Sequence, residues 1–578
     1  MPLLEFEFRG GRYSLRAGRI RVSQSTFLIA AAVVVGLGGG FGAVGFRALI
    51  DAETYFAFAL LGARLAALLG PFGLIVQLAI GGVIAVLIAS KFAPEARGHG
   101  VPEVMEAVAL RGGEMRPRVI AVKALASATS IGFGGSCGRE GPIVQIGSAI
   151  GSVAGRLARA PAPIVRTLVA CGAAAGISAT FNAPIGGVFF AAEVILGEFA
   201  PRSFAAIVVS SVVAAVIGRA FLGNHPSFNA AGFVLVSPAE LVFYACLGFV
   251  AAAWATGFVR LLYGCEDAFD ALRWPAWVKG AVGFGLVGVV GIWFPQVFGV
   301  GYASVQQVLD GHVAARHALA LAALKPLATS LTLGAGGSGG IFAPSLFTGA
   351  FLGDSFGRVV HDLFPSWTAA PAAYGLVGMA AVFAAAAEAP ITAIMIVFEM
   401  SGDYTIILPL MVCVVIAAVL GRRFLGATIY ERKLLRRGID WQRVRRPRFL
   451  SRVYVGAIER QPPVVATPEE SATDVARRLA GSDELAVPVC KDGRFIGVVH
   501  ASDLAHAMAT GEAGHAIATI VRASPAQLSP RDSVERAATL MADGAVPLLP
   551  VVDDATNKLQ GIVTRRDVLQ IYRSTVDV

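Results

Sequence analysis

The chain has 578 residues, of which 56% are hydrophobic and only 15% are charged, and its mean hydropathy is +0.68. Soluble proteins carry about 25% charged residues, so this composition excludes an ordinary soluble protein and indicates several membrane spans. The six cysteines form no CxxC pair, so they indicate neither a metal site nor a disulfide framework.

Two basic segments flank the apolar region. They contain Arg9, Arg12, Arg16, Arg19 and Arg21 before the first span, and Arg422, Arg423, Arg432, Lys433, Arg436, Arg437, Arg443, Arg445, Arg446 and Arg448 around and after the end of the last. Basic residues beside spans favour the cytoplasmic side, so we expect both termini in the cytoplasm of a bacterial inner-membrane protein. Such clusters could also bind nucleic acid, but beside a span they set topology and contact anionic lipid. We therefore expect lipid, and no nucleic acid, as a partner.

The domain boundaries are predicted from the points where the apolar part of the sequence begins and ends. We expect a cytoplasmic segment at 1–22, an all-α polytopic membrane domain at 23–440, a linker at 441–455 and a soluble α/β module at 456–578. The basic lead-in runs into a full-length span, so no cleavable signal peptide is expected.

The membrane domain contains one glycine-rich segment twice. Residues 123–157 align with 325–359 without a gap, and 172–193 similarly match 378–399. The halves therefore cover about 23–222 and 237–426. Internal repeats with broken helices are typical of transport proteins whose inverted halves meet at mid-membrane, so we expect an inverted repeat.

Three glycine-then-proline sequences predict helix starts inside the membrane. They are GHGVP at 98–102, GGSCGREGP at 134–142 and GGSGGIFAP at 336–344. A helix start leaves backbone N–H groups unpaired and carries about +0.5 of an elementary charge, which attracts anions. Glycine starts often serve helix packing alone, but three of them, two related by the repeat, favour an anion pore. A cation site would instead offer acidic rings or carbonyls.

Glu140 lies within one of these helix starts, where its counterpart in the second copy is Phe342. A carboxylate at membrane depth is a functional hypothesis by default. It can occupy the place of an anion and open that place when protonated or displaced. The alternative is a helix-start glutamate stabilised by the dipole or paired with Arg139. No nucleophile–base pair or metal cluster accompanies Glu140, so a membrane enzyme or a cation carrier is a weaker hypothesis.

The C-terminal module also repeats internally. Helix Thr473–Leu479 and strands at 486–490 and 495–499 are followed by helix Ser533–Met541 and strands at 548–552 and 559–563. Each unit closes with the pattern G-h-h-x-x-x-D-h, at 497–504 and 561–568.

The motifs together resemble the CLC family of chloride channels and chloride/proton antiporters, followed by a tandem of CBS domains. The resemblance rests on GREGP at 138–142, FNAPIGG at 181–187, GSGGIFAP at 337–344 and the closing pair of α/β units, in this order. It implies a homodimer of all-helical subunits, each with its own pore and an inverted repeat. It also implies chloride as the bound ion and no required cofactor.

By this resemblance Glu140 is the external gating glutamate. The backbone N–H groups of Arg139, Glu140 and Gly141 would bind an external anion, and those of Ile341 and Phe342 the central one. Tyr430 would bind the central anion through its hydroxyl; the alternative role is an interfacial aromatic anchor.

Two positions depart from the family pattern. The GHGVP start, with His99 and Gly100, stands where GSGIP is usual, so His99 replaces an anion-binding serine. Its imidazole either donates a hydrogen bond in the pore, making affinity pH-dependent, or turns away and packs. Selectivity among chloride, nitrate, bicarbonate and fluoride therefore stays open.

Val194 is the second departure, because it follows Glu193 where antiporters usually have the internal proton relay. Valine cannot carry a proton, so we slightly favour passive chloride conduction. The alternative is a chloride/proton antiporter with another inner proton route. Glu193 has a counterpart, Glu399, and this symmetry favours a structural role at helix ends.

In CBS domains the aspartate after the last strand can hold a nucleotide ribose, with a nearby Ser or Thr at the phosphates. Asp503, Thr564 and Asp567 occupy these positions, while the first unit has His500 where Thr is usual. The resemblance thus implies a possible adenine nucleotide; the structural alternative is that these residues only cap the final helices.

Overall fold

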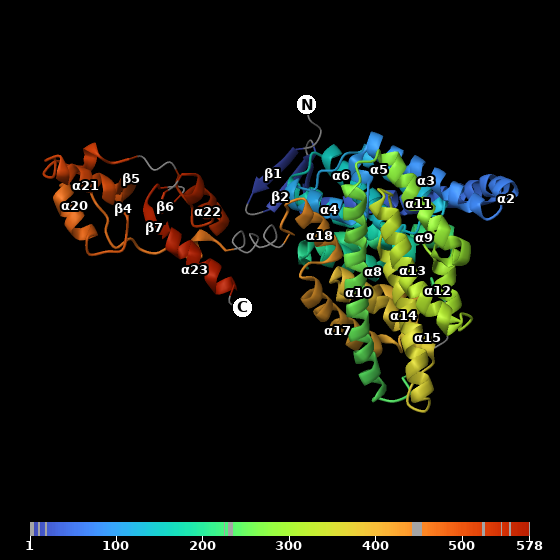
Figure 1. Ribbon diagram of the computed structural model, residues 1–578. Helices are drawn as coiled ribbons and strands as arrows, with labels where there is room; N and C mark the ends of the chain where they lie inside the picture. The colour runs from blue at the N-terminus through green and yellow to red at the C-terminus, as the bar shows by residue number, and fades with distance from the viewer. Residues whose placement is uncertain are drawn as a thin grey trace. The chain divides into compact units, whose positions relative to one another are not determined.

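A computed structural model describes residues 5–9, 12–17, 20–224, 226–228, 235–441, 453–522, 526–544, 546–553 and 556–576. The chain divides into two compact units, Met1–Trp441 and Gln442–Val578. The first is mostly helical, and the second, orange and red in Figure 1, combines strands with helices. Residues 442–452, most of the expected linker, lie outside the described residues.

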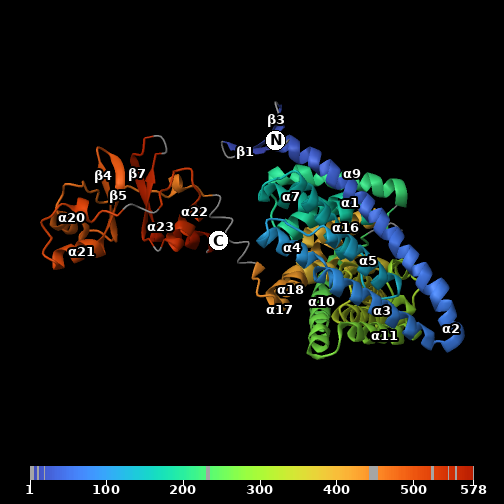
Figure 2. The same cartoon turned by 90° about the horizontal axis from the view of Figure 1, so that it is seen from above.

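The first half of the membrane unit follows a small antiparallel sheet of order β1-β2-β3 (Glu5–Arg9, Arg12–Ala17 and Ile20–Ser23). Its helices are α1 (Gln24–Thr54), α2 (Ala63–Leu69), α3 (Phe72–Phe92), α4 (Val101–Leu110), α5 (Arg118–Gly132), α6 (Glu140–Leu157), α7 (Ala162–Phe181), α8 (Pro184–Phe190) and α9 (Pro201–Leu222). α1 is a long helix along one side of the unit, and a π-helical segment, Tyr55–Gly62, joins it to α2 (Figure 2).

The second half repeats this order. Its helices are α10 (Glu240–Ala271), α11 (Ala276–Trp293), α12 (Tyr302–Leu309), α13 (Ala315–Gly334), α14 (Phe342–Leu363), α15 (Pro371–Ala387), α16 (Pro390–Ser401), α17 (Ile407–Leu425) and α18 (Ile429–Arg436). Helices α3 to α9 correspond in order to α11 to α17. The fold confirms the predicted internal repeat of an all-helical membrane domain.

Helix length and composition support the membrane assignment. Seven helical stretches among the described residues are long and apolar enough to cross a bilayer, and shorter apolar helices lie at Pro184–Leu196, Pro371–Ala387 and Pro390–Ser401. A span needs about 20 residues, so the short helices are the broken elements that the Gly and Pro pattern predicts.

The two halves meet through their glycine-rich segments, which run antiparallel there. Gly138 N–H donates to Gly340 O at 2.7 Å, and Gly340 N–H donates to Gly138 O at 2.6 Å. Hydroxyl groups repeat the exchange: Ser338 bonds Ser127 and Ser130, while its counterpart Ser136 bonds Thr329 and Thr332. Equivalent residues thus contact one another across a pseudo-two-fold axis, as an inverted repeat requires.

Glycine permits two close helix crossings, one in each half. In α6 against α7, a Cβ on Gly147 would clash with Gly172 O; in α14 against α15, a Cβ on Gly349 would clash with Gly378 O. Small residues at such crossings let membrane helices pack backbone against backbone. These crossings hold α6 and α14 in place, and both helices begin at the candidate site.

The C-terminal unit consists of two similar hairpins with helices. Its elements are α20 (Ala472–Leu479), β4 (Ala486–Lys491), β5 (Arg494–His500), α21 (Ala501–Ala509), α22 (Val534–Asp543), β6 (Leu548–Val552), β7 (Leu559–Thr564) and α23 (Arg565–Val576). The four predicted strands are confirmed, and β4 pairs with β5 as β6 pairs with β7, both antiparallel. The segment preceding each repeat bridges to the other repeat's hairpin, Arg460 to Ile562 and Arg522 to Val498.

Candidate anion site

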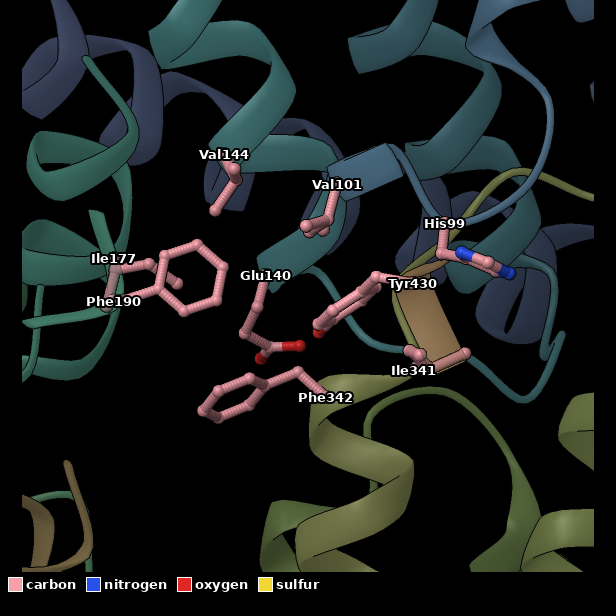
Figure 3. A pocket seen from close by; sticks show the side chains of 10 residues that line it. His99, Val101, Glu140, Val144, Ile177, Phe190, Ile341, Phe342 and Tyr430 are labelled. Carbon is pink, nitrogen blue, oxygen red and sulfur yellow. The ribbon is translucent and has the colours of Figure 1, made fainter. Parts of the chain in front are cut away.

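Four helix starts converge on one narrow cavity in the membrane unit. They are the first turns of α4, α6, α14 and α18. The lining residues are His99, Val101, Glu140, Gly141, Val144, Ile177, Phe190, Ile341, Phe342 and Tyr430 (Figure 3). Three of these starts are those that the sequence predicted. Of the predicted anion-binding residues, the cavity lining includes all except Gly100 and Arg139.

Backbone geometry explains how three helices begin at one place. Gly100 precedes α4 with φ of +83°, and a Cβ there would lie 2.8 Å from Gly141 O. Gly98 N–H donates to Gly337 O at 3.1 Å, and Gly339 N–H donates to Gly98 O at 3.2 Å. Only glycine combines this backbone conformation with such close approach. The first turns of α4, α6 and α14 therefore border a common space, and helix N-termini favour an anion there.

Glu140 is the first residue of α6, and it is only 1% exposed. Its Oε1 accepts a 2.5 Å hydrogen bond from the Tyr302 hydroxyl. Its Oε2 is buried without a partner among the described residues and lies against Gly138, where a Cβ would clash with it. The same Cβ would lie 3.2 Å from Ala343 N, so the carboxylate is beside the first turn of α14. A built-in anion thus occupies the space between two helix starts.

Arg139 caps the same helix but points elsewhere. Its guanidinium lies 5.4 Å from the centre of the Tyr302 ring, and among the described residues it makes no ion pair with Glu140. The alternative in which Arg139 simply neutralises Glu140 by direct pairing is therefore not what the structure contains.

Tyr430 enters the cavity from α18. The helix start is fixed by a capping box, in which Thr428 accepts from Glu431 N–H and the Glu431 carboxylate accepts from Thr428 N–H. Arg422 donates to Glu431 at 3.2 Å and to Glu388 at 2.6 Å. Tyr430 is 1% exposed, and Figure 3 shows its hydroxyl end directed toward Glu140. This position fits a pore residue better than an interfacial anchor.

His99 also lines the cavity, but its ring is directed away from Glu140 (Figure 3). The imidazole lies near two phenol rings, with ring centres 6.5 Å from that of Tyr430 and 6.3 Å from that of Tyr263. Its Nδ1 is buried without a partner among the described residues. His99 therefore borders the anion space while its ring packs among aromatic side chains.

Val194 is buried in the core at 7% exposure and is not among the cavity-lining residues. Its neighbour Glu193 accepts from the N–H groups of Ile391 and Thr392 at the start of α16. Glu399 likewise accepts from Ile185 and Gly186 N–H at the start of α8. The predicted structural role of this symmetric pair is confirmed, because each carboxylate caps a helix of the other half.

Two buried lysines were missed by the sequence analysis. Lys123 donates to Ala96 O and Gly98 O at 2.9 and 2.8 Å, and Lys325 donates to Val297 O and Gly299 O at 2.8 and 2.7 Å. Both are 0% exposed and, within the described part of the chain, pair with carbonyl oxygens rather than a carboxylate. Each places its Nζ at the backbone that leads into a helix start, α4 for Lys123 and α12 for Lys325. The sequence did contain a signal for them, because a lysine is the first residue of both copies of the glycine-rich segment, 123–157 and 325–359.

Tyr302 was also missed as a partner of Glu140. It occupies the α12 position equivalent to Val101 of α4, following Gly301 as Val101 follows Gly100. Nothing in the sequence indicated that α12 contacts α6.

In the C-terminal unit the three candidate nucleotide residues are held by protein groups. Thr564 donates to Asp567 through its N–H at 2.8 Å and its hydroxyl at 2.7 Å, which caps α23. Arg460 pairs with Asp567 and Glu484, and Arg522 pairs with Asp503. The hydrogen bond to Glu484, together with Asp567, raises the pKa of Arg460 above its usual value. Capping is thus present, while Asp503 and Asp567 remain at equivalent ends of β5 and β7.

No group of three or more His, Cys, Asp or Glu side chains suited to a metal ion occurs in the described parts of the chain.

Comparisons with known proteins identify both units. A family model described as voltage gated chloride channel matches residues 81–422, and a CBS domain model matches 455–510 and 517–574. A protein of Ralstonia nicotianae named as a chloride channel protein, ClcB-like, is 33% identical over 349 residues, covering 60% of this chain and 81% of that protein. A Vibrio campbellii protein named H(+)/Cl(-) exchange transporter ClcA is 31% identical over 356 residues, covering 60% of this chain and 76% of that protein. A solved structure of a slow cyanobacterial Cl-/H+ antiporter aligns with a TM-score of 0.66 and 28% identity, covering 71% of this chain and 97% of that one.

Proposed function

Because this chain belongs to the voltage-gated chloride channel family, an anion transport family, we propose that it exchanges chloride for protons across a cell membrane. The valine at position 194 led us to favour passive conduction from sequence alone. The exchange alternative is better supported, since relatives named as H+/Cl- exchange transporters and a Cl-/H+ antiporter structure match this chain.

The observation that carries the proposal is the buried carboxylate of Glu140 beside the anion-favouring helix starts. As an ion it takes the place of chloride. A proton neutralises it, weakens its attraction to the α14 start and lets it leave, so that chloride can enter. Return of the carboxylate releases the proton and expels the anion. One residue thereby links proton and chloride movement, with Glu140 as the gate.

The remaining cavity residues supply the anion ligands. N–H groups of Arg139, Glu140 and Gly141 would bind the anion on one side of the gate, and those of Ile341 and Phe342, with the Tyr430 hydroxyl, on the other. Lys123 and Lys325 would make the surrounding potential more positive whenever they are protonated. Since Val194 cannot carry a proton, the inner half of the proton route uses a different group.

The test is transport by the purified full-length protein in liposomes. With equal chloride on both sides, an imposed pH gradient should drive net chloride movement, and the reversal potential should shift with pH. A reversal potential that follows chloride alone would leave passive conduction as the function. Substituting nitrate or fluoride for chloride in the same assay measures selectivity.

Glu140→Gln separates the gate from the rest of the transport path. The amide cannot release or take up the proton, so chloride flux should persist but become independent of pH. If the variant keeps the pH response of the unchanged protein, Glu140 is not the gate.

We further propose that the protein is a homodimer with both termini in the cytoplasm. α8 and α16 are too short to cross a bilayer, and they expose Ile185 and Ile391 at 46% and 38% on the surface of one chain. A second subunit would cover them. The protein mass in detergent, measured by light scattering, tests this: a monomeric mass contradicts it.

A further inference from the structure

Tyr302 connects the gate to the opposite half of the membrane unit. It is the first residue of α12, and its hydroxyl donates to Glu140 Oε1 at 2.5 Å. α6 and α12 belong to different halves, so this hydrogen bond spans the repeat. Tyr302 is the side chain that hydrogen-bonds the Glu140 carboxylate among the described residues, and the backbone of Glu140 and Ala343 at the two helix starts also faces this carboxylate.

The surroundings of Tyr302 fix its ring rather than leaving it free to rotate. Phe228 contacts the ring edge-on with centres 5.7 Å apart, Phe181 lies at 6.3 Å, and the Arg139 guanidinium lies over the ring at 5.4 Å. The hydroxyl is therefore held at the carboxylate, and the cation over the ring makes the phenol a better donor. Glu140 cannot leave its place without breaking this bond.

The repeat shows that packing alone does not require a phenol here. The equivalent residue in the first half is Val101, which borders the same cavity without a polar group. At this pair of positions only the second half has a hydroxyl, that of Tyr302. At the α6 and α14 starts only the first half has a carboxylate, that of Glu140.

We propose that Tyr302 is the latch of the gate: its hydroxyl holds the ionised Glu140 carboxylate in the closed position. This hydrogen bond thereby sets the pH at which the carboxylate is protonated and released. This rests on the proposed gating function of Glu140. Tyr302 acts through Glu140, so it is a positioning residue. The other titratable groups near the carboxylate are Arg139, Lys325, Cys137 and Tyr430.

The experiment compares chloride flux in liposomes as a function of pH for four full-length proteins: unchanged, Tyr302→Phe, Glu140→Gln and the double variant. Phenylalanine keeps the ring and removes only the hydroxyl. Losing a hydrogen bond to a charged group should favour the released gate about tenfold. Flux at neutral pH should therefore rise by a similar factor, and the pH of half-maximal flux should move upward. In the Glu140→Gln background the same change should have no effect.

The outcomes separate the latch from the gate and from folding. If Glu140→Gln abolishes the pH response but Tyr302→Phe leaves flux and its pH profile unchanged, the latch is overturned and the gate stands. If Tyr302→Phe changes flux equally in both backgrounds, Tyr302 acts by packing, and the latch is again overturned. If Glu140→Gln itself has no effect, the gating function fails. Tyr374→Phe removes a buried hydroxyl from α15 outside the cavity and should change nothing.

Discussion

The residues at the cavity are distributed unequally between two similar halves. Where the first copy of the glycine-rich segment has Arg139 and Glu140, the second has Ile341 and Phe342. Both pairs lie at a helix start, but only one adds a carboxylate. Because a single titratable anion lies between the two starts, protonation at one point can change the whole path.

His99→Ser tests whether the side chain at the start of α4 affects the affinity of the cavity for an anion. The imidazole ring is directed away from Glu140, whereas a serine hydroxyl could donate to an anion in the cavity. One added hydrogen bond corresponds to about a 2- to 10-fold gain in affinity. We expect chloride to bind more tightly by about this factor in a Glu140→Gln background, measured by titration calorimetry.

Tyr430→Phe provides the opposite control, because it removes a hydroxyl that is directed into the cavity; chloride affinity should fall. If His99→Ser instead weakens binding, the imidazole N–H itself is an anion ligand, and the packing role is wrong.

Sequence patterns located the site residues whose roles depend on backbone. Glycine and proline spacing predicted the starts of α4, α6 and α14, because those residues restrict local conformation regardless of their partners. Tyr302 could not be assigned in this way. Its role depends on α12 lying beside α6, about 160 residues earlier in the chain, and a tyrosine at a helix start is consistent with many roles.

At the scale of elements, glycine pairs set how closely helices approach. The crossings of α6 with α7 and α14 with α15 place carbonyl oxygens where any side chain would lie. Both halves have a glycine pair at this crossing although many flanking residues differ between them. The short distance between the helix axes leaves no room for a larger side chain. The strands of the C-terminal unit were similarly predictable, since short runs rich in β-branched residues between turn residues are typical of β-strands.

Gly349→Ala should destabilise the membrane unit. The added methyl group would clash with Gly378 O, and overpacking of this kind costs about 1–3 kcal/mol. The midpoint of thermal aggregation, followed by gel filtration in detergent, should fall by several degrees.

Gly257→Ala in α10 is the matched control, because nothing lies within 4 Å of its Cβ and alanine favours the helix. Its midpoint should stay the same or rise. Equal midpoints for the two variants would show that the α14–α15 crossing is not close-packed in the protein.

At the scale of the whole molecule, a transport unit is joined to a module of two CBS domains. CBS domains commonly bind adenine nucleotides, and we propose that the second repeat does so, because it keeps both Thr564 and Asp567. The first has His500 in place of the threonine, and His500 makes no side-chain cap of α21. The ribose would have to replace Arg460 at Asp567.

Asp567→Asn should weaken binding of a fluorescent adenosine triphosphate by more than about tenfold, since a charged acceptor for the ribose hydroxyls is lost. The amide oxygen can still cap α23, so the fold should survive. Asp503→Asn, the equivalent change in the first repeat, should have little effect. Unchanged affinity in Asp567→Asn, or equal loss in both variants, would contradict a site in the second repeat. Titration of the full-length protein measures both.

The reciprocal contacts between the halves have a historical consequence. Each half lacks caps and hydroxyl partners that the other supplies, as with Glu193 at α16 and Glu399 at α8. A half-length ancestor therefore had to associate with an inverted copy of itself before its gene was duplicated and fused. In that earlier pair both copies carried the same residue at the helix start. A carboxylate in one half facing a phenylalanine in the other could evolve only after duplication, so the gate is younger than the architecture that holds it.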